Sequence, residues 1–220
     1  MQELDTRLQV VASFVRPGSR VADIGTDHAY LPVWLVHRGI CPGAIASDLN
    51  AGPLRTAHGT VDAAGLADRI DLRLGSGLET VRPGEVEDIV IAGMGGETIA
   101  SILDAVPWVK EGSLRLILQP MTRAEDLRRW LLYNGFTVDR ERYVRDGRRR
   151  YIVLTAHYTD STPPDDELPV YAGFFTAEEG RPYRQRMAAH LVRCAEGLTI
   201  AGQTAEAARL RSLSERLLQL

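Results

Sequence analysis

A run of apolar residues that ends in a single glycine, within residues 20–32, restricts the fold of this chain more than any other feature. The residues before Gly25 suit a buried strand, and the apolar pattern resumes at Ala29 with helical spacing. The segment therefore predicts a strand, a tight turn and a helix. In an open parallel sheet the carboxyl ends of the strands form a crevice at the topological switch point, so we expect a small molecule to bind at this turn.

The charge of the turn argues against a dinucleotide. A dinucleotide site would carry a glycine-rich motif, because backbone N–H groups at the helix start must approach an anionic pyrophosphate. Here Gly25 stands alone between the carboxylates of Asp23 and Asp27. Two like charges about 4 Å apart repel by about 4 kcal/mol at an intermediate effective dielectric. The turn is therefore expected to attract a cation, such as the sulfonium and ammonium groups of S-adenosylmethionine, unless the two carboxylates only cap the helix.

The rest of the first 158 residues alternates between strand and helix patterns. A helix before Pro17 precedes the first strand. Further strands are expected at 44–48, 69–74, 87–93 and 114–118, helices at 52–64, 98–106 and 124–133, and a final hairpin of 136–144 and 149–158 around Asp146-Gly147. This order predicts an α/β fold with the Rossmann-like seven-stranded sheet of class I methyltransferases, whose last strand is inserted antiparallel.

Two later strand ends carry residues suited to an adenosine group. Asp48 closes the second strand about twenty residues beyond the glycine turn, where an acidic side chain can accept ribose hydroxyls, and Leu49 and Asn50 follow it. Dehydrogenases share this feature, and a helix cap would also explain it. At the third strand end, Gly77 lets the backbone pass close to a flat ring and Ser76 can hydrogen-bond an adenine edge.

The fourth strand end and the N-terminal helix complete the candidate pocket. The glycines Gly93, Gly95 and Gly96 leave backbone groups uncovered at the crevice, and Met94 offers a polarizable wall for a cofactor or a base. Arg7 lies one turn into the N-terminal helix. From there it could reach the carboxylate of an amino-acid ligand, or it could belong to a solvated helix face.

Residues 159–169 are polar, acidic and proline-bearing, which predicts a linker between a domain at 1–158 and a helical domain at 170–220. Helical spacing on both sides of Gly202 predicts an antiparallel helical hairpin. Several arginines of this tail are expected on its outer faces, namely Arg184, Arg186, Arg193 and Arg209. They suit a phosphate-tracking surface or simple solvation equally well.

Composition limits the remaining possibilities. The chain has 220 residues, a net charge of −3 and 45% hydrophobic residues, enough for a substantial core. It shows no apolar run near the roughly 20 residues of a membrane span and no signal sequence, so we expect a cytoplasmic protein. Cys41 and Cys194 stand far apart without a ligand pattern, which predicts free thiols and no metal site.

Together these motifs resemble the TrmK family of bacterial tRNA (adenine-N1)-methyltransferases, which modify the adenine at position 22. The resemblance rests on L-D-T-R-L near the start, DIGTDHAYLP, S-D-L-N, IVIAGMGG, LILQP and W-L-L-x-N-G-F, and runs from Leu4 to about Val153. It implies S-adenosylmethionine as cofactor and tRNA as partner, with no membrane and no obligatory protein partner.

The resemblance also implies roles for individual residues. For the methyl donor it implies Asp23, Gly25, Asp27, His28, Tyr30, Asp48 and the loop of Gly93, Met94, Gly95 and Gly96. The positions argued above add Arg7, Leu49, Asn50, Ser76 and Gly77 to the expected donor-binding residues. It also implies a C-terminal helical coiled coil that helps to hold the tRNA. Our expected tRNA-binding residues are Gly96, Gln119, Pro120, Arg148, Arg184, Arg186, Arg193 and Arg209.

The expected catalytic residues are Asp27 and His28. A negative charge at Asp27 would favour the cation that forms on the methylated adenine, and His28 would orient the base or the donor. Three alternatives stay open at this point: a methyltransferase acting on a small molecule or a protein, a non-catalytic RNA-binding relative, and, least favoured by the charge of the turn, a dehydrogenase.

Overall fold

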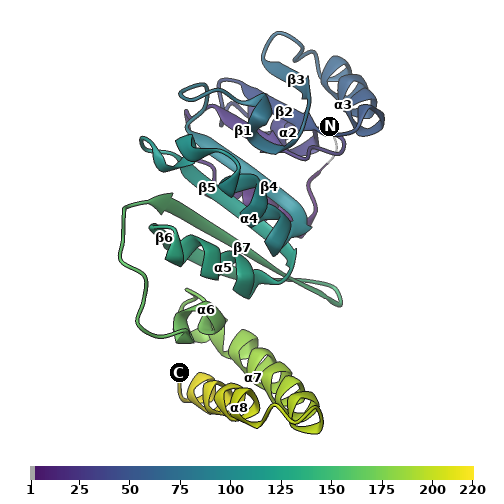
Figure 1. Cartoon of the computed structure of the whole chain (residues 1–220). Helices are drawn as coiled ribbons and strands as arrows, with labels where there is room; N and C mark the ends of the chain where they lie inside the picture. The colour runs from purple at the N-terminus through teal and green to yellow at the C-terminus, as the bar shows by residue number, and fades with distance from the viewer. Residues whose placement is uncertain (1–2) are drawn as a thin grey trace.

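The computed structural model describes residues 3–220, which are arranged around one seven-stranded sheet (Figure 1). The strands are β1 Val21–Ile24, β2 Ala44–Asp48, β3 Ile70–Leu74, β4 Asp88–Gly95, β5 Arg115–Thr122, β6 Phe136–Asp146 and β7 Arg149–Tyr158. Their order in the sheet is β3-β2-β1-β4-β5-β7-β6. The first five strands pair in parallel, whereas β7 runs antiparallel to both neighbours. The predicted sheet, with its inserted antiparallel strand, is confirmed.

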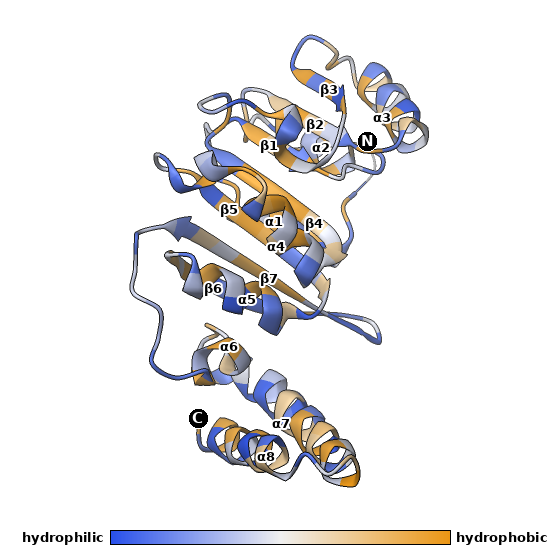
Figure 2. Ribbon diagram, viewed as in Figure 1, coloured by the Kyte–Doolittle hydropathy of each residue, from blue (hydrophilic) through white to orange (hydrophobic). Residues whose placement is uncertain are grey.

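Helices cover both faces of the sheet. The helices before the tail are α1 Thr6–Phe14, α2 Tyr30–His37, α3 Ala51–Ala63, α4 Gly96–Asp104 and α5 Ala124–Tyr133, with short 3₁₀ turns η1 Gly77–Thr80 and η2 Pro107–Lys110. Helices α1, α2 and α3 contribute to one apolar core, whereas α4 and α5 contribute to the other. In β4, Ile89 and Ile91 enter the second core while Val90 enters the first. The central strands are therefore apolar on both faces, as Figure 2 shows for β1, β4 and β5.

Strands β4 and β5 extend beyond their predicted ends. The pairing passes through irregular registers, with Met94 opposite Pro120 and Gly95 opposite Thr122. Gly93 has a φ of +86°, a conformation that disrupts the regular alternation at this point. The predicted glycine loop is therefore the last part of a strand, and α4 begins directly after it. A side chain at Gly96 would place its Cβ 2.1 Å from the carbonyl oxygen of Arg123, so only glycine fits there.

The tail forms the predicted antiparallel helical hairpin. Its helices are α6 Leu168–Ala172, α7 Ala177–Ile200 and α8 Thr204–Gln219, and the chain turns between α7 and α8 at Gly202 with a φ of +78°. Their apolar faces form a third core. The predicted linker was too long at its C-terminal end, because α6 already begins at Leu168.

A buried ion pair attaches this tail to the sheet. The Arg128 guanidinium on α5 and the Glu141 carboxylate on β6 are both fully buried, with Nη2 2.5 Å from Oε1. Arg128 Nη1 also donates to the carbonyl of Val170 and to the Tyr183 hydroxyl, at 2.9 and 2.8 Å. Glu141 accepts the backbone N–H of Phe174 at 2.7 Å. These contacts join α5 and β6 to both α6 and α7.

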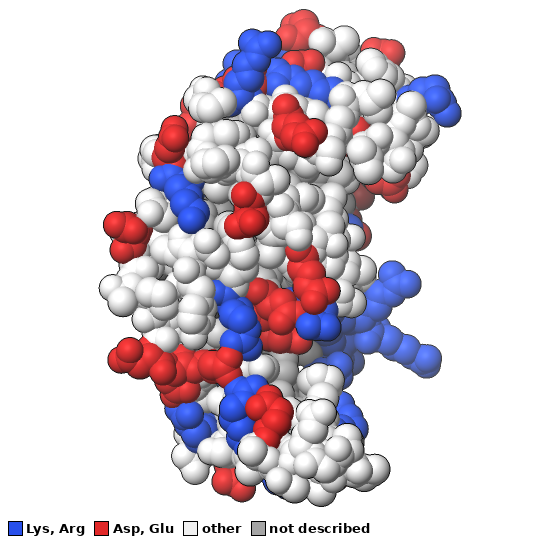
Figure 3. All heavy atoms as spheres, viewed as in Figure 1, with Lys and Arg blue, Asp and Glu red and all other residues white. Residues whose placement is uncertain are grey.

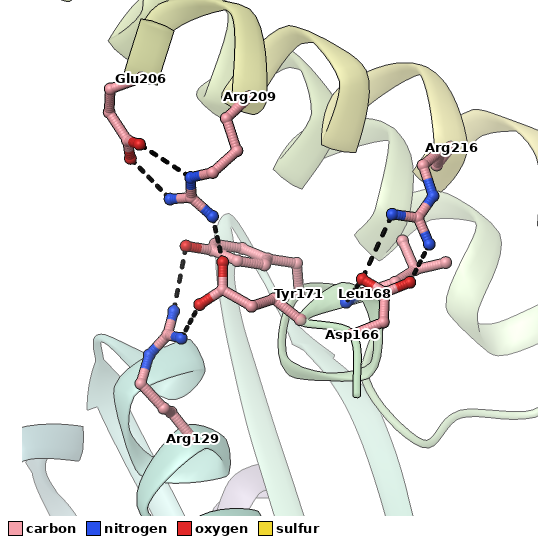
Figure 4. A network of polar contacts seen from close by, with 8 residues as sticks. Arg129, Asp166, Leu168, Tyr171, Glu206, Arg209 and Arg216 are labelled. Carbon is pink, nitrogen blue, oxygen red and sulfur yellow. Dashed lines mark hydrogen bonds and ion pairs between the residues drawn. The ribbon is translucent and has the colours of Figure 1, made fainter. Parts of the chain in front are cut away.

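A second, more exposed set of ion pairs surrounds α6 (Figure 4). Glu167 accepts hydrogen bonds from Arg129 on α5 and from Arg209 on α8, and Arg209 also pairs with Glu206. Asp166 pairs with Arg216, whose guanidinium lowers the pKa of that carboxyl. The acidic residues of the predicted linker therefore hold the hairpin against α5.

None of the helices within residues 3–220 combines the length and apolarity needed to cross a bilayer. Cys41 and Cys194 are both free thiols, the first buried and the second half-buried.

Candidate active site

A pocket of about 560 Å³ lies where the carboxyl ends of β1 and β4 meet the start of α1. Seven of the predicted donor-binding residues line it, namely Arg7, Asp23, Gly25, Asp27, His28, Tyr30 and Gly93. They come from three separate segments of the chain, and the sheet topology brings them together. The position is the crevice expected for an open α/β sheet.

The glycine turn has a fixed shape. Gly25 has a φ of +78°, and the backbone N–H groups of Gly25 and Thr26 both donate to the carbonyl of Ser47, each at 2.8 Å. The methyl group of Met94 lies over Gly25, since a Cβ there would be 2.2 Å from Met94 Cε. Met94 thus covers the turn, and the space that its methyl group occupies is available because Gly25 has no side chain.

Asp23 and Arg7 are a buried carboxyl group and a guanidinium that both line the pocket. Burial raises the pKa of the Asp23 carboxyl to about 6, whereas a hydrogen bond with Thr26 and the nearby Arg7 guanidinium lower it. Sequence reasoning missed Thr26, which is buried beneath the turn. A carboxylate and a guanidinium facing one pocket match the ammonium and carboxylate of an α-amino acid. The methionine portion of S-adenosylmethionine carries this pair of groups, so the residues fit that cofactor.

The outer wall of the pocket consists of Asp27, His28 and Tyr30. The Asp27 side chain is 75% exposed, and its Oδ2 lies 3.2 Å from Nε2 of His28. The His28 ring stacks on Tyr30, with centroids 5.0 Å apart and planes 11° from parallel. His28 Nδ1 is buried and has no hydrogen-bond partner among the described residues. The ring is therefore held in place with one nitrogen left for a further partner.

The predicted adenosine residues lie at the next two strand ends. Asp48 Oδ1 accepts the backbone N–H of Asn50 at 2.7 Å, which leaves Oδ2 to accept a hydrogen bond from a ligand. Ser76 lies directly before η1. Leu49 and Leu74, at the ends of β2 and β3, are large apolar side chains that are 65% and 59% exposed. Exposed apolar groups beside polar ones are typical of a ligand site, and sequence reasoning missed Leu74.

A second cavity, of about 460 Å³, lies between the end of β5, the β6–β7 hairpin and α7. We call this cavity the interdomain groove. Its lining includes Pro120, Arg150, Arg186, His190 and Arg193. Arg186 and Arg193 are exposed and, within residues 3–220, form no ion pair with a carboxylate. The groove thus combines three of the predicted tRNA-binding residues.

The tip of the β6–β7 hairpin adds further positive charge. Arg148 is exposed there, next to Arg149 and Arg150. Figure 3 shows Lys and Arg side chains that project from the molecule beside this hairpin.

Three predicted tRNA-binding residues are buried in this structure, which does not favour direct contact with tRNA: Gly96, Gln119 and Arg184. Arg184 lies on the apolar face of α7 with Ala188 and Leu191, and its Nη2 donates to the carbonyls of Ala177 and Leu220. Helical spacing places it on that face, so its charge was a poor guide to its position. Arg209 is exposed, but two carboxylates already neutralise it.

Comparison with known proteins agrees with this geometry. A family model described as "Methyltransferase domain" matches residues 4–154. The tRNA (adenine(22)-N(1))-methyltransferase of Bacillus subtilis (strain 168) is 40% identical over 171 residues, which cover 78% of this chain and 72% of that protein. The crystal structure of the B. subtilis M1A22 tRNA methyltransferase TrmK is similar with a TM-score of 0.87 and 32% identity, over 99% of this chain and 100% of the other. A Streptococcus pneumoniae protein in complex with S-adenosyl-L-methionine has a TM-score of 0.82 and 34% identity, over 98% and 100%.

Proposed function

Since this chain belongs to the TrmK family of tRNA (adenine(22)-N1)-methyltransferases, we propose that it transfers a methyl group from S-adenosylmethionine to N1 of adenine 22 in tRNA. The observation that carries the proposal is the pocket at the β1 turn, where Asp23 and Arg7 present opposite charges at the switch point of a methyltransferase sheet. This observation favours a methyltransferase over a dehydrogenase.

The donor site follows from the charges of the pocket. S-adenosylmethionine, when bound, supplies a methyl group on a sulfonium. Asp23 would hold the ammonium group of the donor and Arg7 its carboxylate. Asp48 would accept the ribose hydroxyls, while Leu49, Asn50, Ser76 and Gly77 would surround the adenine, and Met94 and Gly95 would close the side next to β4. Apart from Arg7, which comes from α1, these residues lie at or just beyond the carboxyl ends of β1, β2, β3 and β4.

The chemistry needs little acid–base assistance. N1 lies on the pairing edge of adenine, so the target base has to leave its stack, which costs a few kcal/mol. Its lone pair then attacks the methyl group, and the ring becomes cationic without losing a proton first. Catalysis therefore consists mainly of alignment, which is worth up to about 7–11 kcal/mol in well-oriented systems. Asp27, at the pocket mouth, would favour the new cation, and His28 would orient the base.

The interdomain groove is our proposed tRNA site. Arg186 and Arg193 on α7, with Arg148 at the hairpin tip, present guanidinium groups that no carboxylate of the described chain neutralises. Arginine matches phosphate geometry well. Pro120 lines this groove and pairs in the sheet with Met94, which covers the turn of the donor pocket. Phosphates held here would offset the free energy of turning the base out.

The test of the function uses the purified chain alone. The protein is incubated with labelled S-adenosylmethionine and bulk tRNA that lacks the modification, and the labelled nucleotide is mapped. Label on N1 of adenine 22 supports the proposal and shows that no protein partner is required. Donor binding without transfer to tRNA would favour a small-molecule or protein substrate. Because tRNA is the proposed substrate, we place the protein in the cytoplasm.

Donor binding is expected to depend on pH through Asp23. In the ligand-free protein this carboxyl has a pKa of about 6, and the donor ammonium favours its charged form. Binding at pH 6 should therefore release part of a proton, whereas binding at pH 8 should release none. Below pH 6 the affinity should fall by up to about tenfold per pH unit. The free energy of unfolding of the ligand-free protein should depend on pH in the opposite direction. The raised pKa of Asp23 favours the folded protein at acid pH, and this contribution is lost as the pH rises through 6.

Calorimetry in buffers of different ionisation enthalpy measures the released proton. In Asp23→Asn the proton release at pH 6 should disappear. A wild-type affinity that stays constant from pH 5 to pH 8 would remove Asp23 from the ammonium site.

The groove arginines are expected to carry tRNA binding. The double variant Arg186→Gln/Arg193→Gln should weaken tRNA binding and make the slope of log affinity against log salt shallower by about 1 for each arginine. Donor affinity should not change. The matched control is Arg20→Gln/Arg82→Gln. It removes two exposed arginines that precede β1 and β4, at the amino ends of the strands and away from the pocket. Equal salt slopes for the two double variants would exclude the groove as the phosphate site.

A further inference from the structure

Gln119 is a fully buried amide in an otherwise apolar part of β5. Its side chain nevertheless makes contacts across three segments of the chain. The carbonyl oxygen Oε1 accepts from Arg7 Nη1 at 2.8 Å and from the backbone N–H of Gly93 at 3.1 Å. The amide nitrogen Nε2 donates to the carbonyl of Pro120 at 2.9 Å. Gln119 therefore links α1, β4 and the end of β5.

The orientation of this amide is determined by its partners. Arg7 Nη1 and the N–H of Gly93 are both donors, so only the oxygen of the amide can face them. The carbonyl of Pro120 is an acceptor, so it requires the nitrogen on the other side. Because a buried polar group without a partner is costly, each of these contacts keeps the side chain in one orientation.

Arg7 depends on this contact for its position in the donor pocket. Its side chain is 19% exposed, and its one ion pair within residues 3–220 is with Asp5, at the longer distance of 3.6 Å. Arg7 Nη1 also lies 4.0 Å from where a Cβ of Gly93 would be. Gln119 thus fixes the guanidinium beside the β4 wall of the pocket, opposite the buried Asp23.

The neutrality of Gln119 matters as much as its hydrogen bonds. A glutamate of the same length would accept the same two hydrogen bonds, but it would lose the donor to the Pro120 carbonyl and would form a buried ion pair with Arg7. That pair would satisfy the positive charge of Arg7 inside the protein. With an amide, the guanidinium is oriented without a buried carboxylate at position 119 to neutralise it, so its charge can act on a ligand.

We infer that Gln119 is a positioning residue, which aims Arg7 at the carboxylate of the methyl donor and leaves the charge of Arg7 available to it. The inference rests on the proposed function, because it requires S-adenosylmethionine in this pocket. It adds a specificity role: the protein should distinguish donors by their carboxylate, and Gln119 should control that distinction through Arg7.

The experiment compares two ligands by calorimetry, S-adenosylmethionine and its decarboxylated analogue. The wild-type protein should bind the first at least tenfold more tightly, as expected for a charge-assisted contact of about 1.4 kcal/mol or more. Arg7→Met should abolish this preference. Gln119→Glu should reduce it nearly to parity, and Gln119→Met should reduce it severalfold because Arg7 loses its acceptor. A purely structural role would lower the affinity for both ligands equally.

Two controls separate the possible failures. Gln203→Glu adds the same charge at the exposed turn between α7 and α8 and should keep the wild-type preference. In the Arg7→Met background, Gln119→Glu should not change the ratio further. An unchanged ratio in both Gln119→Glu and Gln119→Met overturns the inference. If the wild-type protein binds neither ligand, the proposed function itself fails.

Discussion

Replacing Asp27 with alanine is expected to lower kcat by about 100-fold while leaving the affinity for tRNA nearly unchanged. The carboxylate stands at the pocket mouth, where the adenine ring would gain its positive charge. Asp27 is largely exposed. Within residues 3–220 it forms one ion pair, in which Oδ2 lies 3.2 Å from Nε2 of His28. Its loss should therefore remove stabilisation of the transition state without disturbing the fold.

Single-turnover kinetics at saturating donor and tRNA measure this effect, with calorimetry for donor binding. Asp27→Asn is the matched control, because it keeps the shape of the side chain and removes only its charge. We expect Asp27→Asn to be nearly as slow as Asp27→Ala. If both variants retain the wild-type kcat, Asp27 has no electrostatic role in the reaction.

Replacing Glu141 with glutamine is expected to lower the free energy of unfolding by about 3–5 kcal/mol. The substitution leaves the Arg128 charge buried without its partner and weakens the acceptor for the backbone of Phe174. For a chain of this size the loss corresponds to a fall in Tm of about 6–20 °C. The tail should loosen first, because Arg128 and Glu141 join α5 and β6 to α6 and α7.

Thermal unfolding followed by circular dichroism measures this loss. The control is Glu206→Gln, the same chemical change in the exposed pair with Arg209 on α8. Exposed pairs contribute only about 0–1 kcal/mol, so this control should unfold close to the wild-type temperature. A Glu141→Gln variant with the stability of the control would mean that the buried pair contributes nothing to the attachment of the tail.

Local pattern predicted most of the fold. The β2 strand and helix α5 begin and end where the sequence predicted, because apolar periodicity and flanking turn residues are local signals. The ends of β4 and β5 were placed too early. Glycines and prolines normally end a strand. Here β4 and β5 continue past Gly93 and Pro120 because the pairing between them shifts register at these positions.

The donor pocket was more predictable than the tRNA surface. Most of its residues lie within one turn of a strand end, so topology alone brings Asp23, Asp27 and Gly93 together. The tail arginines depend on distant partners that spacing does not identify. Arg209 meets Glu167, 42 positions away, and Gln119 meets Arg7, 112 positions away. Residue type alone suggested that these side chains bind tRNA, but whether they are free to do so depends on partners far away in the sequence.

The buried pair of Arg128 and Glu141 also bears on how one nucleotide is selected. Because it joins the helical hairpin firmly to the sheet, the span from the groove arginines to the mouth of the donor pocket is constant. With tRNA in the proposed site, the protein would measure a fixed distance: phosphates bound in the interdomain groove would determine which base can reach the donor pocket. Selection of the nucleotide would follow from that distance, without the need to read the sequence around it.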